Sequence, residues 1–151
     1  MSFKNKFKIK GLDRKQKYST AAKIIIDSKL RVINKKVNRY FNNDSLENLH
    51  DTRLAFRRFR YVLELFYDCI EPKLYKRVYE YSKQMHGLLG QARDLDVLEQ
   101  KFRLTEAEIN QKLPESFYEK INKDKDKIRN QVKMELINFI ADKDINKFLL
   151  H

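Results

Sequence analysis

The chain has 151 residues, close to the size of one domain, and its 33 Lys and Arg against 21 Asp and Glu give a formal net charge of +12. With 42% hydrophobic residues it can build a core, and its 3 Gly and 2 Pro exclude a collagen-like or turn-rich all-β chain. A single cysteine, Cys69, excludes an internal disulfide and a cysteine-based zinc site and fits a reducing compartment. The absence of a signal-like or 18-residue apolar run favours a cytoplasmic protein.

The basic excess is concentrated at the start of the chain. Residues 1–40 hold 13 Lys and Arg against two acids, a net of +11. Such a charge predicts a polyanionic partner (nucleic acid, polyphosphate or an anionic membrane), with a solvated lysine-rich surface as the alternative. Residues 1–17 contain too little apolar side chain for a helix, so we expect a basic arm there and one helical domain over residues 18–151.

The first helix is expected from residue 19 or 20 to about residue 41, because apolar residues recur there every three or four positions. These residues are Ala22, Ile26, Leu30, Ile33, Val37 and Tyr40. Lys29 and Lys36 flank this stripe and are expected to point along a groove between helices. Arg31, Lys35 and Arg39 lie on the opposite side, toward water.

The second helix is expected from Asp44 to about Cys69, with Asp44 as a capping acid three residues before Glu47. The third begins at Pro72 and is weakened near its end by two glycines, after which residues 92–102 are helical again or continue after a bend. A short helix near residues 105–113 ends at Pro114, a last main helix covers residues 116–141, and a final turn follows at residues 144–150. Four main helices with short links predict an all-α, antiparallel four-helix bundle.

A row of basic residues marks the second helix. His50, Arg53, Arg57 and Arg60 are spaced i, i+3, i+7 and i+10, which places them within a sector of roughly 80° over about 15 Å of helix, whereas Arg58 points elsewhere. Guanidinium groups donate paired hydrogen bonds to phosphate and stay charged. A row at helical pitch therefore suits a polymeric phosphate better than a single small anion.

Two interpretations of this row stay open at the level of spacing. The arginines either face a ligand or pair with acids on neighbouring helices, for which Glu64, Asp94 and Asp96 are candidates. In the segment LLGQARDLDVL, Asp96 either caps a helix start, or Arg93 points at a ligand while Asp94 orients an arginine of the second helix.

Nothing in the sequence has the spacing of a catalytic centre, since a Gly-rich phosphate loop, a Ser/His/Asp set and paired carboxylates on an apolar face are all absent. We therefore expect no enzyme and no cofactor. His50 and Asp51 are adjacent on a helix and diverge, so no metal site is expected, and His86 is interpreted as a bundle or surface histidine. Lys125 falls on the inward side of the last main helix, where it either snorkels or enters the anion groove.

Two motifs together carry a family resemblance. HDTRLAFRRFR followed about 30 residues later by LLGQARDLDVL resembles the CHAD domain, a helical family named for its histidines, and FKIKGLD and IADKDINKFLL resemble the edges of that family more weakly. The resemblance covers about residues 7–150. It implies an all-α protein that binds inorganic polyphosphate, is found near polyphosphate granules in some bacteria, and is not itself an enzyme.

The resemblance also implies site residues. It assigns His50, Arg53, Arg57, Arg58, Arg60 and Arg93 to the basic anion-binding surface, with Asp94 and Asp96 as organisers. A full CHAD domain holds two similar four-helix halves, and 151 residues supply one half, so we expect a twofold homodimer.

The sequence thus predicts polyphosphate binding through a rigid basic groove of second-helix arginines, with Lys29, Lys36 and Lys125 contributed by the first and last helices. The alternatives are a helical protein that binds a nucleic-acid backbone and an interaction module without polyphosphate affinity. Because the phenylalanines of the second helix fall on its apolar side, contact with nucleic acid would be limited to the backbone.

Overall fold

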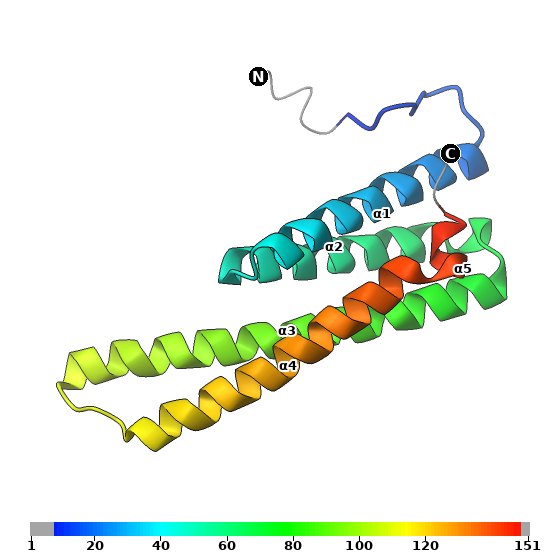
Figure 1. Cartoon of the computed structure of the whole chain (residues 1–151). Helices are drawn as coiled ribbons and strands as arrows, with labels where there is room; N and C mark the ends of the chain where they lie inside the picture. Colours follow the sequence, from blue (N-terminus) through cyan, green and yellow to red (C-terminus); the bar gives the residue numbers. More distant parts are fainter. Residues whose placement is uncertain (1–7, 149–151) are drawn as a thin grey trace.

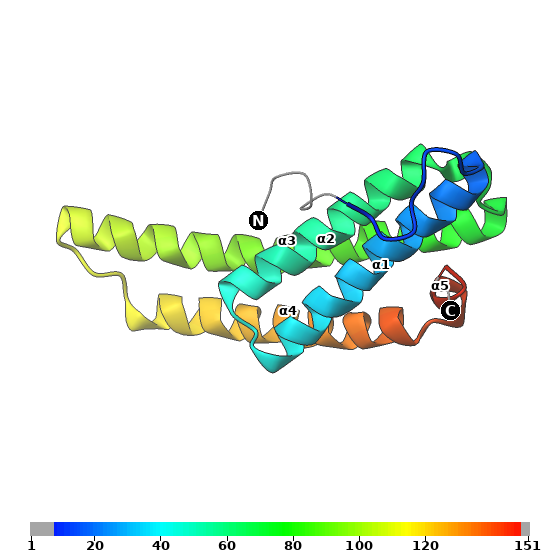
Figure 2. The same cartoon turned by 90° about the horizontal axis from the view of Figure 1, so that it is seen from above.

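The structure, a computed structural model that describes residues 8–148, is all-helical over that range and contains no strand there. Figure 1 shows two helical hairpins stacked side by side, and Figure 2 shows the first hairpin lying across the second. The elements are α1 (Tyr18–Asn42), α2 (Leu46–Leu65), the 3-10 turn η2 (Tyr67–Cys69), α3 (Pro72–Ile109), α4 (Glu115–Ala141) and α5 (Lys143–Asn146).

The hydrophobic core forms where the two hairpins meet. The predicted stripe of the first helix is buried along its full length, from Ala22 to Tyr40. Phe139 of α4 joins the layers, because its ring meets Phe56 of α2 edge-on at 4.8 Å and Tyr81 of α3 at 5.4 Å between ring centroids. Each helix thus buries one apolar face and leaves a polar face outside.

The second helix is shorter than its sequence suggests. Ser45, not Asp44, is the capping residue, since its side chain accepts a hydrogen bond from the backbone N–H of Asn48 at 3.2 Å. The helix ends at Leu65, and residues 67–69 form a separate 3-10 turn, so the predicted end near Cys69 was wrong. The Asp44 carboxylate instead pairs with Arg129 and Lys133 of α4.

The third helix is longer and more regular than expected. It runs without a break from Pro72 to Ile109, so neither the predicted bend nor the separate short helix near residues 105–113 is present. Two glycines cost about 1 kcal/mol each relative to alanine in a helix. Packing of α3 against α2 on one side and α4 on the other offsets that local cost. Asn110 ends the helix in the left-handed conformation, with φ 52°.

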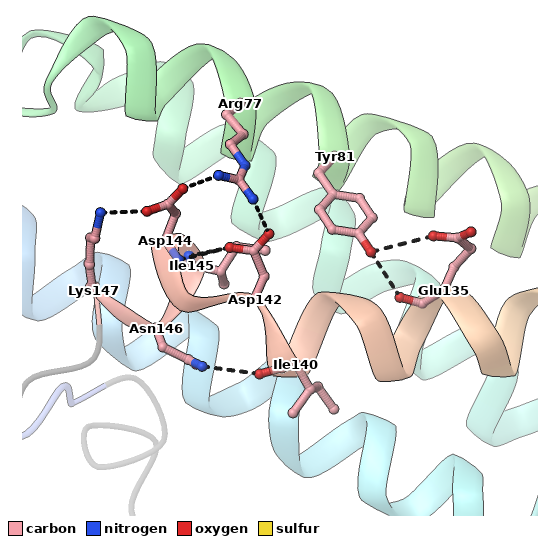
Figure 3. A network of polar contacts seen from close by, with 9 residues as sticks. All are labelled: Arg77, Tyr81, Glu135, Ile140, Asp142, Asp144, Ile145, Asn146 and Lys147. Carbon is pink, nitrogen blue, oxygen red and sulfur yellow. Dashed lines mark hydrogen bonds and ion pairs between the residues drawn. The ribbon is translucent and has the colours of Figure 1, made fainter.

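A polar network fixes the short C-terminal helix α5 against α3 (Figure 3). Arg77 of α3 donates to the carboxylates of Asp142, at 2.7 Å, and Asp144. Asp142 also caps α5, since its side chain accepts from the backbone N–H groups of Asp144 and Ile145. The final turn predicted at residues 144–150 corresponds in part to α5, and residues 149–151 lie outside the described range.

A second ionic network, centred on Asp96, ties α4 to α3 and to the start of α2. Asp96 is only 2% exposed and accepts from Arg129 at 2.9 Å, while the Lys125 ammonium lies 3.1 Å from its other oxygen. Arg129 also donates to the backbone carbonyl of Asp44 at 2.6 Å, and Lys133 binds the Asp44 carboxylate at 2.9 Å. The buried Asp96 carboxylate thus joins α3 to α4, and Arg129 and Lys133 extend the network to Asp44, just before α2.

Replacing Asp96 by Ala is expected to lower the free energy of unfolding by about 3–5 kcal/mol, because it leaves the partly buried Arg129 without its carboxylate. Urea denaturation followed by circular dichroism measures this loss. Asp94→Ala is the matched control: Asp94 is exposed and forms no ion pair within residues 8–148, so its effect is expected to stay within about 0.5 kcal/mol. Equal losses for the two variants would contradict the structural role of Asp96.

Candidate functional site

A row of arginines and histidines lies along the line where α2 and α3 pack together. We call it the arginine seam, and it consists of His50, Arg53, Arg57 and Arg60 of α2 with His86 and Arg93 of α3. Arg57 is exposed and the other five are partly buried. The row is therefore open to solvent while its base rests on the helices.

Contacts between the two helices show that both sides of the seam face each other. At one end, Arg60 donates to the hydroxyl of Tyr79 at 3.1 Å. Farther along, Nε of Arg53 lies 3.4 Å from the position that a Cβ on Gly90 would occupy, so the guanidinium rests directly on the α3 backbone. The helices α2 and α3 run in opposite directions (Figure 1), and Arg93 is the charge that acts most strongly on His50, so these two residues continue the seam beyond Arg53.

The seam gathers positive charge with little compensation from acids. Arg53, Arg57 and Arg93 form no ion pair with any residue from 8 to 148. Arg60 is the exception, since Glu64 lies 3.8 Å away and also accepts a hydrogen bond from Tyr79 at 2.8 Å. The alternative interpretation, in which Arg53, Arg57 and Arg60 all pair with acids of neighbouring helices, therefore does not describe this structure.

Several buried nitrogen atoms of the seam have no hydrogen-bond partner within the described residues. They are Nδ1 of His50, Nε of Arg53, Nε of Arg60 and Nε2 of His86. Each unsatisfied buried polar group costs about 1–3 kcal/mol. Four such atoms along one row show that the helices pack at the seam at a cost in stability.

The two imidazoles of the seam respond to this cationic surrounding. Burial, then the charges of Arg93, Arg53 and Arg57, lower the pKa of His50, and Asp51 opposes them only in part. Burial and the neighbouring arginines, with Arg53 the strongest, also lower the pKa of His86. Both rings are therefore neutral near pH 7 and gain protons more readily once an anion lies beside them.

The lysines predicted for the site lie outside the seam. Lys36 of α1 is bound to Asp51 at 2.5 Å, and Lys125 of α4 is bound to Glu99 at 2.5 Å as well as to Asp96. Lys29 is partly buried on α1. None of the three forms an ion pair with an acid beside Arg53, Arg57 or Arg93 within residues 8–148, and their part in the site stays a prediction.

The remaining predicted residues are also placed apart from the seam. Arg58 is exposed on α2, one residue and hence about 100° around the helix from Arg57. Asp96 faces α4, and Asp94 lines a depression between α3 and α4, where it contacts no arginine of α2 by an ion pair within residues 8–148. The organising roles that the family resemblance implies for these acids stay predictions.

His86 is the member of the seam that sequence reasoning missed. His86, Gly90 and Arg93 are spaced i, i+4 and i+7 and so share one face of α3. That spacing is the signal that points to it. Spacing alone does not show that this face of α3 lies against the arginines of α2, because that depends on how the two helices pack.

A large depression near Lys125 does not have the character of the seam. It encloses about 750 Å³ between α3, α4 and the start of α2. Its cations, Arg103, Lys125 and Arg129, are each paired with an acid. It therefore offers no excess positive charge to an anion.

Two further classes of site are absent from the described part of the chain. Within residues 8–148 no helix is both long and apolar enough to cross a membrane. The same residues hold no group of three or more His, Cys, Asp or Glu side chains arranged to hold a metal ion.

Comparison with known proteins gives one family. No curated protein and no solved structure matches the chain. The sequence model of the CHAD domain matches residues 24–149, a range that contains every residue of the arginine seam. The CHAD domain is a binding module rather than a catalytic family and is generally linked to polyphosphate. Because this match covers nearly the whole chain, the protein belongs to the CHAD domain family.

Proposed function

We propose that the chain, folded as an antiparallel four-helix bundle, binds inorganic polyphosphate along the arginine seam and has no catalytic activity of its own. The observation that carries this proposal is that three seam arginines, Arg53, Arg57 and Arg93, have no acid partner within residues 8–148. Family membership supports the same ligand class. A cytoplasmic location close to polyphosphate granules would fit this role.

The shape of the seam favours a linear polymer over a small anion. From His50 to Arg60 the row extends about 15 Å, which is longer than one phosphate group. Successive phosphoryl units can each meet a guanidinium, and every charge-assisted contact replaces counterions released from the polymer. Because Arg53, Arg60 and Arg93 are partly buried, less of their side-chain freedom remains to be lost on binding than for the exposed Arg57.

The seam residues have different parts in this proposal. Arg53, Arg57 and Arg93 contact phosphate oxygens directly. Arg60, already held by Tyr79 and Glu64, marks the end of the row. His50 donates a hydrogen bond to the ligand once it is protonated. Arg58 and the predicted lysines, namely Lys29, Lys36 and Lys125, add to the positive field around the polymer.

The rivals of this proposal make different predictions. The aromatic rings of α2 nearest the row, Phe56 and Phe59, are fully buried, so no base can stack on them. Competition of long polyphosphate against RNA and DNA at fixed ionic strength therefore separates the two polyanions at the seam. If the domain were an interaction module for a protein, Arg53→Ala/Arg57→Ala would leave polyphosphate binding untouched.

Replacing Arg57 by Ala is expected to weaken polyphosphate binding by about 1–3 kcal/mol, because the variant lacks one charge-assisted hydrogen bond to phosphate. The difference should shrink as salt is raised, since screening weakens the same interaction in the native protein. Isothermal titration calorimetry with polyphosphate of defined length, at two salt concentrations, measures both effects.

Lys120→Ala is the charge-matched control for this experiment. Lys120 is exposed on α4, away from the seam, and its replacement removes the same single charge. An equal decrease of affinity in the two variants would show that net charge alone drives binding, and the seam would no longer be the site.

Polyphosphate affinity is expected to increase as the pH falls from about 8 to about 5.5. In the free protein the lowered pKa values of His50 and His86 keep both rings neutral, whereas bound phosphates favour the protonated rings and raise those pKa values. Binding thus takes up protons.

The stability of the free protein has the opposite pH dependence. Because the two histidines have lower pKa values in the folded chain, the unfolded chain binds more protons, and stability decreases as the pH falls through about 6.5.

Titration calorimetry in buffers of different ionisation enthalpy counts the protons taken up on binding. His50→Asn/His86→Asn is expected to retain the salt dependence of binding and to lose most of its pH dependence. A pH profile in the double variant that matches the native profile would assign the effect to the ligand's own groups and contradict a role for the two imidazoles.

The twofold homodimer expected from the family resemblance stays a prediction. Multi-angle light scattering at tens of micromolar protein measures the mass in solution, and the mass of two chains is the expected result. A monomer that still binds polyphosphate with full affinity would contradict the need for a second copy.

A further inference from the structure

The many basic residues of the N-terminal part of the chain are not part of the arginine seam. Residues 1–40 carry 13 Lys and Arg against two acids, yet every seam residue lies between positions 50 and 93. Within the described residues this charge lies on α1 and on the segment 8–17 before it. It therefore requires an explanation separate from the seam.

One side of α1 faces away from the rest of the molecule. Its apolar side is buried in the core, and Figure 1 shows α2 lying between α1 and α3. A shallow depression of about 480 Å³ runs along the opposite side and is lined by α1 alone. We call this surface the outer face of α1, and its residues are Arg31, Asn34, Lys35, Asn38, Arg39 and Asn42.

The outer face holds cations that are little compensated. Lys35 and Arg39 are exposed and form no ion pair with any residue from 8 to 148. Arg31 pairs with Asp27 at 2.9 Å, and Asp27 is the sole acid in the sequence of α1. Attraction to an anionic partner therefore rests on Lys35 and Arg39, one turn apart.

Amide side chains accompany these cations in a regular stripe. Asn34, Asn38 and Asn42 are spaced i, i+4 and i+8, and none of their amides is hydrogen-bonded to another residue of the described chain. Asparagine is a poor helix former, so a stripe of three costs helix stability without adding to the core. Amides both donate and accept hydrogen bonds, which suits sugars, phosphates and base edges.

We propose that the outer face of α1 binds a nucleic-acid duplex through its backbone, as a second polyanion surface separate from the arginine seam. Residues 31–42 cover about 16 Å of the helix, a length over which Lys35 and Arg39 can meet backbone phosphates while the amides reach neighbouring sugars and phosphates. No aromatic residue lines the face, which disfavours a single strand that needs stacking.

The same composition argues against a membrane surface. An interfacial helix inserts a broad apolar side between lipids. The residues that line the outer face are all cations or amides, and the apolar side of α1 is occupied by the core. A polyphosphate chain, which has no sugar or base, would leave the amide stripe with fewer acceptors and donors to use.

The test uses the full chain and a fluorescein-labelled 20-base-pair DNA duplex, with a duplex RNA of equal length, in fluorescence anisotropy. Lys35→Gln/Arg39→Gln is expected to raise the Kd about tenfold and to reduce the salt slope by about two, one for each phosphate that the variant no longer neutralises. Asn38→Ala/Asn42→Ala is expected to raise the Kd several-fold without altering that slope, because it removes hydrogen bonds and no charge.

Two controls separate this surface from general charge and from the seam. Lys120→Gln/Lys123→Gln removes two exposed charges from α4 and should change the Kd less than twofold. Arg53→Ala/Arg57→Ala should impair polyphosphate binding and leave duplex binding intact, whereas Lys35→Gln/Arg39→Gln should do the reverse. The failure of either site is thus visible while the other persists.

Three results would overturn the proposal. The first is a Kd for both duplexes that is the same in Lys35→Gln/Arg39→Gln as in Lys120→Gln/Lys123→Gln. The second is loss of polyphosphate binding, with no loss of duplex binding, in the α1 variant. The third is sedimentation with vesicles containing phosphatidylglycerol that depends on Lys35 and Arg39 while duplex binding does not. Circular dichroism confirms that each variant is folded.

Discussion

Guanidinium groups held side by side without carboxylates are the feature on which the functional surface depends. Arg53 and Arg57 project from one face of α2, and Arg93 approaches from α3, so like charges are brought together by helix packing. Such an arrangement costs electrostatic energy in the free protein. The hydrophobic core, to which Phe56 and Phe59 of the adjacent face of α2 contribute, supplies stability that offsets this cost.

The acids of the chain are placed where they leave this row uncompensated. Asp96 is three residues beyond Arg93, yet it turns toward α4 and binds Arg129 and Lys125. Asp51 follows His50 directly and is engaged by Lys36 of α1. Each of these potential partners of a seam residue is therefore occupied by a cation from another helix, and the ion pairs that stabilise the fold also keep the seam positive.

Local regularities of the sequence predicted much of the fold and one side of the site. The helical period alone places His50, Arg53 and Arg57 on one face of α2, since spacing along a helix needs no knowledge of the tertiary structure. The continuity of α3 through Gly90 was not predictable in the same way, because packing on both sides offsets the local cost of glycine. The position of His86 depends on how α2 and α3 are set against each other, and the partner of Asp96 lies 33 residues away.

The net charge of the middle of the chain does not reveal the seam, because folding separates its basic residues from its acidic ones. Residues 41–113 contain 12 Lys and Arg and 12 Asp and Glu, a net of zero, although the whole seam lies within them. Three acids in this range, Asp44, Asp96 and Glu99, pair with cations of α4, and Glu64 is the acid that remains beside a seam arginine. Residues 1–40, by contrast, contain almost no acids, and α1 carries Lys35 and Arg39 on its outer face. The two surfaces therefore differ physically. The arginine seam is basic only because folding moves nearby acids away from it. The N-terminal part of the chain is basic by composition, so it attracts polyanions even before the chain is folded.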